Sequence, residues 1–244
     1  MYTRNNVILI TGGTSGIGYE LVRQFYELEN KIIVTSSNHD RLVQLENQFP
    51  KIKTTVCDLS NPLAVRNLID KCLFEHHDIN VVINNAGIQY NYAWKEEADG
   101  YNKIETEIRV NFISPMQIIY GLLPLLTVKQ DSAIVNISSA LAFAPKKSAP
   151  VYCATKSAIR NGTKALRYQL ENTTVKVFEI IPPLVDTAMT QGRGKGKISP
   201  KQLVDEFLKN FKNSKLESNI GKTKLLRVIQ RISPQLADSI LKNG

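Results

Sequence analysis

The chain has 244 residues, of which 43% are hydrophobic, and its formal net charge is +9. These values are typical of a globular protein with a substantial core, and they exclude collagen-like and low-complexity chains. The apolar run near the start is too short for a signal peptide or a membrane span. The three cysteines lack metal-ligand spacing, so we expect free thiols in a cytoplasmic protein and no metal site.

The positive charge is concentrated late in the chain. Residues 1–190 carry 19 Lys and Arg against 18 Asp and Glu, whereas residues 191–231 carry 11 against 3. Such a segment can contact nucleic acid, an anionic membrane surface or an anionic substrate. It has no aromatic ladder or nucleic-acid-binding motif, so we expect no nucleic-acid partner. A solvated basic lid and tail is the favoured interpretation, and peripheral contact of residues 191–231 with an anionic surface is the alternative.

The first predicted unit is a strand, a glycine-rich turn, a helix and a second strand. Residues 7–10 form a continuous apolar run, as expected for a strand that is buried on both faces. The sequence TGGTSGIG at 11–18 follows directly, and apolar residues then recur at helical spacing before the strand at 31–35. Glycines in this position let the backbone approach a pyrophosphate at the N-terminus of the helix. A tight turn without a ligand is the alternative.

The alternation of helices and strands continues to residue 181. It predicts a doubly wound (Rossmann) α/β fold, with a parallel sheet that carries helices on both faces. No linker interrupts the pattern, so we expect a single domain over residues 1–244. The further predicted strands are 52–56, 79–83, 133–137 and 175–181, and the further predicted helices are 39–49, one that starts at Asn61-Pro62, 101–127 with a bend at Pro115, and 152–172.

Beyond Pro183 the regular pattern is lost. Alternating glycines at 191–197 predict a mobile segment, and Ser199-Pro200 start a helix to about residue 210. Ligands of parallel sheets bind at the carboxyl ends of the strands. We therefore expect residues 186–212 to form a mobile lid over that edge, followed by a basic C-terminal extension. An ordinary surface loop is the alternative.

Tyr152 and Lys156 are the strongest candidates for acid–base chemistry. Residues four apart share one face of a helix. A free tyrosine titrates near pH 10, and a nearby cation stabilises its phenolate, which can make it a general acid or base near neutral pH. The same spacing also occurs by chance on solvated helices, so the pair needs support from the rest of the sequence.

That support comes from a resemblance to the short-chain dehydrogenase/reductase family, in its compact single-domain branch. Its motifs occur in family order over about residues 5–190: TGGTSGIG at 11–18, NNAG at 84–87, Asn111, Ser139, and Tyr152 with Lys156. The sequences IIPPLVDT and VYCATK also resemble a bacterial reductase subgroup labelled for D-alanyl teichoic acid metabolism. That label does not specify a substrate.

The resemblance implies a catalytic tetrad. Tyr152 would exchange a proton with the substrate oxygen, and Lys156 would bind the nicotinamide ribose and lower the pKa of the tyrosine. Ser139, selected over Ser138 by the family's spacing to the tyrosine, would donate to the substrate carbonyl. Asn111 would hold a water molecule of a proton relay. The structural alternatives are turn residues at a strand end for the serines and a helix-interior amide for Asn111.

The resemblance also implies a nicotinamide dinucleotide cofactor. NAD-dependent members usually have Asp where Ser36 stands, and NADP-dependent members often have Arg where Ser37 stands. Because Ser36 replaces this Asp, no carboxylate repels a 2′-phosphate at this position, and Arg41 could bind the phosphate. NADP(H) is therefore the preferred prediction, and NAD(H) is the alternative. Pro182-Pro183 replaces the family's Pro-Gly and stiffens that turn. The predicted cofactor-binding residues are Gly12, Ser15, Gly16, Ile17, Gly18, Ser36, Ser37, Asp58, Asn85, Ala86, Gly87, Tyr152, Lys156, Val185 and Thr187.

We therefore predict an NAD(P)(H)-dependent carbonyl reductase or alcohol dehydrogenase that acts on a small-molecule substrate. The substrate pocket is expected between Ser139, Tyr152, residues 141–143 and the lid. A non-catalytic dinucleotide-binding regulator or scaffold is the alternative, although such a protein would not need the tetrad. The family resemblance further implies a homodimer or homotetramer.

Overall fold

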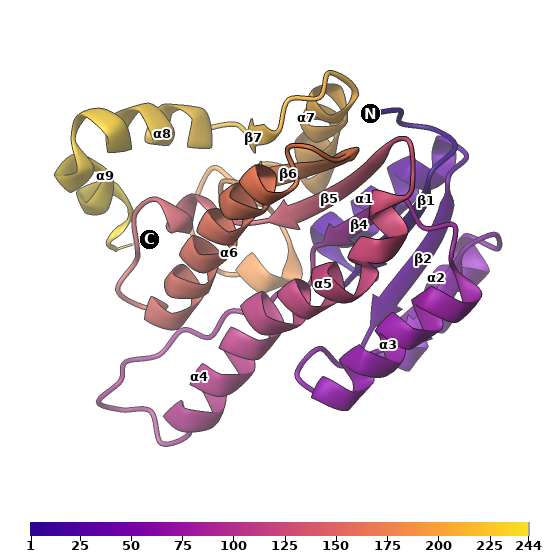
Figure 1. Ribbon diagram of the computed structural model, residues 1–244. Coiled ribbons are helices and arrows are strands. Elements are labelled where there is room, and N and C mark those ends of the chain that lie inside the picture. Colours follow the sequence, from indigo (N-terminus) through magenta and orange to yellow (C-terminus); the bar gives the residue numbers. More distant parts are fainter. Residues whose placement is uncertain (244) are drawn as a thin grey trace.

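A parallel sheet forms the centre of the computed structural model, which describes residues 1–243 (Figure 1). Its seven strands lie in the order β3-β2-β1-β4-β5-β6-β7, and all pairs are parallel. The predicted doubly wound α/β fold is therefore confirmed. The strands are β1 (Val7–Thr11), β2 (Lys31–Ser36), β3 (Lys53–Val56), β4 (Val81–Asn84), β5 (Ser132–Ile137), β6 (Val175–Ile181) and β7 (Glu217–Asn219).

Helices cover both faces of the sheet. One face carries α1, α2 and α7, and the other carries α3, α5 and the C-terminal part of α6 (Figure 1). The helices are α1 (Gly16–Glu27), α2 (His39–Gln48), α3 (Pro62–Glu75), α4 (Gly100–Ile108), α5 (Ser114–Thr127), α6 (Pro150–Gln169), α7 (Pro200–Lys212), α8 (Thr223–Ile232) and α9 (Pro234–Leu241).

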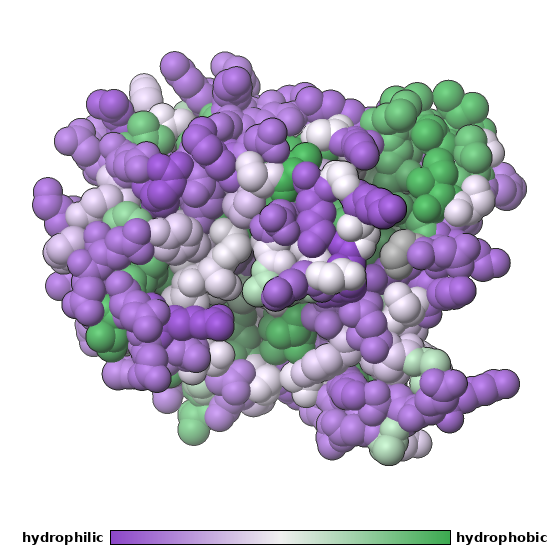
Figure 2. Space-filling model, turned by 180° about the vertical axis from the view of Figure 1, so that it is seen from behind, coloured by the Kyte–Doolittle hydropathy of each residue, from purple (hydrophilic) through white to green (hydrophobic). Residues whose placement is uncertain are grey.

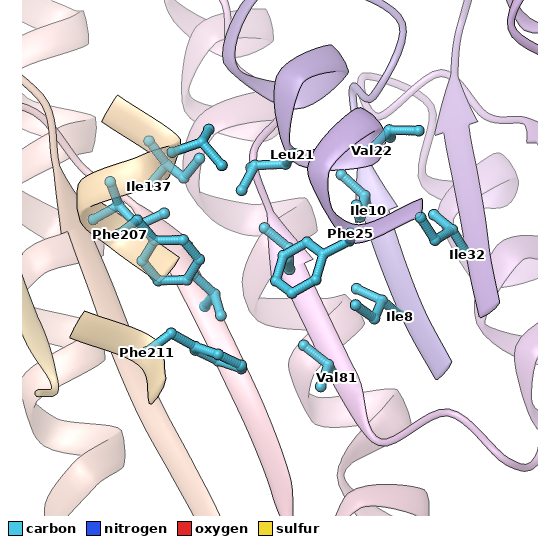
Figure 3. Close-up of a cluster of buried hydrophobic side chains, with 14 of the residues drawn as sticks. Ile8, Ile10, Leu21, Val22, Phe25, Ile32, Val81, Ile137, Phe207 and Phe211 are labelled. Carbon is cyan, nitrogen blue, oxygen red and sulfur yellow. The ribbon is translucent and has the colours of Figure 1, made fainter. Parts of the chain in front are cut away.

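The central strands are apolar throughout because both of their faces are buried. Ile8 and Ile10 of β1 point into the layer of α1 and α7, whereas Leu9 points into the layer of α3 and α5. Phe25 of α1 and Phe211 of α7 meet over the sheet with ring centroids 6.1 Å apart (Figure 3). These contacts pack α1 and α7 against the sheet that carries the candidate site.

The predicted helix over 101–127 is built from three pieces. A π-helical turn, Arg109–Ile113, joins α4 to α5 directly before Pro115. By length and composition alone, residues 100–127 could span a membrane. Ile118 and Leu122, however, are fully buried against the sheet, as expected for a core helix of the α/β fold. The π-helical turn also carries Asn111, and such turns often occur at functional sites.

The C-terminal part of the chain differs most from the predicted elements. β7 adds a seventh strand beside β6, where six strands were predicted. It is short and polar, so it lacks the apolar run that indicates a buried strand. Helix α7, inside the predicted lid, buries Phe207 and Phe211 in the core. The part of the lid that precedes α7 is residues 186–199, of which Ile198 packs against the core, and the mobility of this part remains a prediction.

Helices α8 and α9 present a hydrophobic surface to solvent. Leu226 of α8 packs inward, while five neighbouring aliphatic side chains are half-exposed or more. Figure 2 shows them as a hydrophobic area over the C-terminal helices. This exposed aliphatic face consists of Leu225, Val228, Ile232, Leu236 and Ile240.

Candidate active site

The glycine loop between β1 and α1 is shaped for a ligand. Gly12 and Gly16 have φ values of +65° and +55°, which residues with a side chain rarely adopt. A Cβ atom on Gly12 would lie 2.9 Å from the Cα atom of Ala86, and one on Gly18 would lie 2.2 Å from the carbonyl oxygen of Gly12. The loop therefore requires glycine, and it leaves backbone and the helix N-terminus open to a phosphate group, as a dinucleotide would need.

The turn after β4 is tied to this loop. The side-chain amide of Asn85 donates to the carbonyl oxygens of Thr11 and Gly12, both at 2.9 Å. The backbone N–H groups of Asn85 and Ala86 both donate to Thr11 Oγ1 at 3.1 Å. These bonds join two segments that are distant in sequence into one wall at the carboxyl edge of the sheet.

A cleft follows this edge, and most predicted cofactor residues line it. Two do not. Gly18 packs behind the loop against Gly12, and Val185 is 4% exposed and lines a neighbouring cavity. The predicted residues that line the cleft are Gly12, Ser15, Gly16, Ile17, Ser36, Ser37, Asp58, Asn85, Ala86, Gly87, Tyr152, Lys156 and Thr187.

The end of β2 has hydroxyl groups where a carboxylate could stand. Ser36 Oγ accepts hydrogen bonds from Thr14 Oγ1 and from the backbone N–H of Asn38, both at 3.2 Å. Ser37 and Arg41 line the same end of the cleft. The residues at this end therefore offer hydroxyls and a cation, which suit a ribose hydroxyl or a phosphate.

Tyr152 and Lys156 lie together in the first turns of α6. They are 8% and 4% exposed. Lys156 Nζ lies 5.5 Å from the centroid of the Tyr152 ring and donates to the carbonyl oxygen of Ile137 at 2.9 Å. This bond anchors the ammonium group at the end of β5, beside the phenol.

Burial dominates the titration of both groups. It raises the pKa of Tyr152 above its usual value, whereas a side-chain hydrogen bond with Ser139 and the charge of Arg193 act in the opposite direction. Burial also lowers the pKa of Lys156 to about 8, and the charge of Glu107 opposes this. The sequence led us to expect that Lys156 lowers the pKa of the tyrosine; in this structure burial outweighs such an effect, and Tyr152 stays protonated at neutral pH.

The two serines after β5 point to different places. Ser138 is buried, and its hydroxyl donates to Glu179 Oε1 at 2.6 Å. Ser139 begins the short 3-10 helix Ala140–Ala142, with its Oγ accepting from the N–H of Leu141 at 3.1 Å. Ser139 lines the same cavity as Tyr152. Ser138 also lines a cavity with Tyr152, the cleft described above, so the selection of Ser139 over Ser138 remains a prediction.

Asn111 is held by the segment after β4. Its Oδ1 accepts from the N–H of Ile88, and its Nδ2 donates to the carbonyl oxygen of Ile88, both at 2.9 Å. A Cβ atom on Gly87 would lie 3.2 Å from Asn111 Oδ1 and 3.5 Å from Lys156 Nζ. Asn111 and Lys156 therefore border one small space, and the relay assigned to Asn111 remains a prediction.

Glu107 is a buried carboxyl group that the sequence did not reveal. It is fully buried; its Oε1 accepts from the N–H of Tyr90 at 3.1 Å, and its Oε2 has no partner within residues 1–243. Burial raises its pKa to about 7, and the charge of Lys156 acts in the opposite direction. In the sequence, Glu107 lies one helical turn before Asn111 and resembles an ordinary solvated glutamate of a helix. Its burial is recognised only from the tertiary fold.

A second cavity, of about 360 Å³, adjoins the cleft. Ser139 and Leu141 line it, as do Pro183 and Arg193. Of the predicted wall at 141–143, only Leu141 lines this cavity; Ala142 and Phe143 line a different pocket, and the Phe143 ring centroid lies 4.5 Å from the guanidinium of Arg160. Tyr152 lines both the cleft and this cavity, which we call the substrate cavity.

A family model described as short chain dehydrogenase matches residues 6–197. The chain belongs to the short-chain dehydrogenase family, and it is an oxidoreductase of that family. The predicted family membership is confirmed.

Two relatives place the chain within this family. It is 37% identical over 223 residues to the uncharacterized oxidoreductase DltE of Bacillus subtilis (strain 168), which covers 89% of this chain and 88% of the relative. It is 31% identical over 194 residues to the NADP-dependent 3-hydroxy acid dehydrogenase YdfG of Salmonella typhi, which covers 78% of this chain and 77% of the relative.

Solved structures share the fold. A short-chain dehydrogenase from Burkholderia cenocepacia J2315 in complex with NADP has a TM-score of 0.88 at 23% identity, with 100% of both chains covered. A short-chain dehydrogenase/reductase from Burkholderia phymatum in complex with NAD has a TM-score of 0.84 at 18% identity, with 100% of this chain and 98% of the other covered. At these identities the likeness concerns the fold.

Proposed function

We propose that this protein is an NAD(P)(H)-dependent oxidoreductase that interconverts a carbonyl and an alcohol on a small molecule, with Tyr152 as general acid/base. One observation carries the proposal: the Tyr152 side chain lines both the dinucleotide-type cleft and the substrate cavity. A proton donor at this junction can act where cofactor and substrate meet. The alternative, a dinucleotide-binding regulator, does not need a titratable group there.

In the direction of reduction, the substrate carbonyl oxygen lies between Ser139 and Tyr152. The Ser139 hydroxyl donates a hydrogen bond and stabilises negative charge on that oxygen. Tyr152, which burial keeps protonated, then transfers its proton to the oxygen. The cleft residues would hold a nicotinamide cofactor, which would supply the hydride. Lys156 stabilises the phenolate that remains, and Asn111 borders the route by which the proton is replaced.

For the cofactor we propose NADP(H), with NAD(H) as the alternative. The hydroxyls of Ser36 and Ser37 and the guanidinium of Arg41 support a 2′-phosphate, since no carboxylate at the end of β2 repels it. Gly12, Ser15, Gly16 and the other residues of the cleft would hold the pyrophosphate and adenosine. The segment 186–199 would close over the bound nicotinamide.

We further propose a cytoplasmic homodimer or homotetramer. Cys57, Cys72 and Cys153 are buried and form no disulfide, as is usual for proteins of a reducing compartment. Exposed Tyr120 and Tyr168 on α5 and α6 support packing between subunits. Size-exclusion chromatography coupled to light scattering gives the mass of the assembly in solution. A monomer at micromolar concentration would contradict the proposed oligomer.

Two measurements on one preparation distinguish the enzyme hypothesis from the regulator hypothesis. Titration with NADPH and NADH gives cofactor affinities, and a panel of aldehydes and ketones with NADPH reports turnover at 340 nm. Cofactor-dependent turnover of at least one carbonyl is the expected result. Tight dinucleotide binding with no turnover on the whole panel, in either direction, would favour the regulator.

A further inference from the structure

Two cations of the substrate cavity have no counter-ion within residues 1–243. Lys146 precedes α6 and is only 8% exposed, and Arg193 reaches the cavity from the glycine-rich segment after β6. No Asp or Glu lines this cavity. None of the ion pairs found within residues 1–243 involves Lys146 or Arg193. Lys146 is buried and Arg193 is half-buried. Buried charges in proteins are normally paired, so a buried lysine beside a second cation, with no acidic partner within residues 1–243, requires an explanation.

Both cations converge on one neutral side chain. The Gln89 amide is assigned with its oxygen toward them, because neither cation can accept a hydrogen bond. In this orientation the oxygen accepts from Lys146 Nζ at 2.9 Å and from Arg193 at 3.3 Å. An amide oxygen carries only a partial charge, so it does not neutralise two cations. Burial and the charge of Arg193 both lower the pKa of Lys146, as expected for an ammonium group that lacks an anion.

The position of the two cations connects them with substrate rather than cofactor. Lys146 and Arg193 line the substrate cavity and are absent from the lining of the cofactor cleft. Lys195 lines the same cavity and adds a third positive charge. Arg193 is close enough to the reacting group that its charge acts on the pKa of Tyr152. An anion bound here would lie beside the proton donor.

We infer that the substrate carries an anionic group, a carboxylate or a phosphate, which binds between Lys146 and Arg193 while its carbonyl faces Ser139 and Tyr152. This inference rests on the proposed function and specifies its substrate class. The anion displaces the Gln89 oxygen or joins it, and each cation gains a charge-assisted hydrogen bond. Arg193 stands between Gly192 and Gly194, whose φ values of +72° and +61° mark a turn that only small residues tolerate well. Because Arg193 lies in this turn, an anion bound to Arg193 orders the glycine-rich segment around it.

The test compares charged and neutral forms of the same carbonyl compound. Oxo acids with the carbonyl at successive chain positions are assayed with NADPH beside their methyl esters, and dihydroxyacetone phosphate is assayed beside dihydroxyacetone. We expect kcat/KM for at least one anionic compound to exceed that of its neutral partner by about a hundredfold, since two hydrogen bonds to a charged group are lost in the neutral form. The acid and phosphate arms identify which anion binds.

Variants then locate the effect. Lys146→Gln and Arg193→Gln should each lower the anion-to-neutral ratio of kcat/KM at least about tenfold, mainly through KM. Lys147→Gln is the matched control, because this neighbouring lysine is exposed and lies outside the substrate cavity. It should leave the ratio within about twofold of the parent protein. Circular dichroism and NADPH affinity establish that each variant is folded.

Each outcome decides the matter. Equal turnover of acids, phosphates and their neutral partners by the parent protein would overturn the inference and leave the proposed reaction intact. So would an equal loss on charged and neutral compounds in the Lys146 and Arg193 variants, since that indicates a structural role. No turnover of any carbonyl would overturn the proposed function, and this inference with it.

Discussion

The ammonium group of Lys156 lies 5.5 Å from the centre of the Tyr152 ring and donates to the carbonyl oxygen of Ile137. Burial lowers the pKa of Lys156 to about 8. Below this value the lysine is charged and stabilises a phenolate, and above it the lysine loses its charge. We therefore predict that the rate of carbonyl reduction falls as the pH rises through about 8. Lys156→Arg keeps the charge at higher pH and should move this decline to higher pH, in profiles of kcat from pH 6 to 10.

Glu107 should make the folded protein less stable at neutral pH than at pH 4.5. Its folded-state pKa is about 7 and the ordinary value is 4.5. The stability associated with its neutral form is fully present below about pH 4.5 and is lost as the pH rises through 7. Glu107→Gln should remove this loss, so the variant gains about 2–3 kcal/mol relative to the parent between pH 4.5 and 8. Urea unfolding at both pH values measures the difference.

Glu105→Gln is the control for this comparison. Glu105 lies on the same helix with its side chain 71% exposed. Its substitution should change stability by less than about 0.5 kcal/mol at either pH. If the parent and Glu107→Gln lose stability in parallel from pH 4.5 to 8, the assignment of a buried neutral carboxyl is wrong.

Gly18→Ala should disable cofactor binding. A Cβ atom there would lie 2.2 Å from the carbonyl oxygen of Gly12 and 2.3 Å from Nδ2 of Asn85. One contact is with the loop that would hold the pyrophosphate and the other with the Asn85 amide that is bonded to it, so NADPH affinity should fall at least about tenfold. Gly100→Ala, where the nearest atom would be 3.9 Å away, should bind NADPH like the parent. Fluorescence titration compares the two, and equal affinities would contradict this role of the loop.

Ser36→Asp tests the cofactor preference. A carboxylate at the end of β2 repels a 2′-phosphate and can accept from a ribose hydroxyl. NADPH binding should therefore weaken more than NADH binding, by about tenfold or more. Parent protein that binds the two cofactors equally well would not support the assignment of NADP(H).

Local patterns were sufficient to predict much of the fold. Strand β6 (Val175–Ile181) and the start of α3 at Pro62, with Asn61 as its cap, match the predicted elements because apolar runs and helix caps are read from neighbouring residues. The glycine loop was equally visible. β7 was missed because its three residues pair with β6 through backbone bonds and have no apolar run.

The candidate site residues that escaped prediction come together only in three dimensions. Lys146 and Arg193 are distant in sequence and lie on different loops, yet both contact Gln89. Glu107 is buried because α4 packs against α6, a contact that helical periodicity alone does not specify. Packing of other segments buries Lys146 and Glu107 and leaves Arg193 half-buried, although each looks like an ordinary surface residue in the sequence.

The central claim is that Tyr152 transfers the proton. The most direct measurement is kcat for reduction of a turned-over carbonyl by parent and Tyr152→Phe proteins, with NADPH affinity measured for both. Tyr2→Phe, at an exposed tyrosine that lines neither the cleft nor the substrate cavity, is the control. We predict that kcat falls about 10²–10⁴-fold in Tyr152→Phe while NADPH affinity changes little and the control matches the parent. Equal kcat values for parent and Tyr152→Phe would contradict the mechanism.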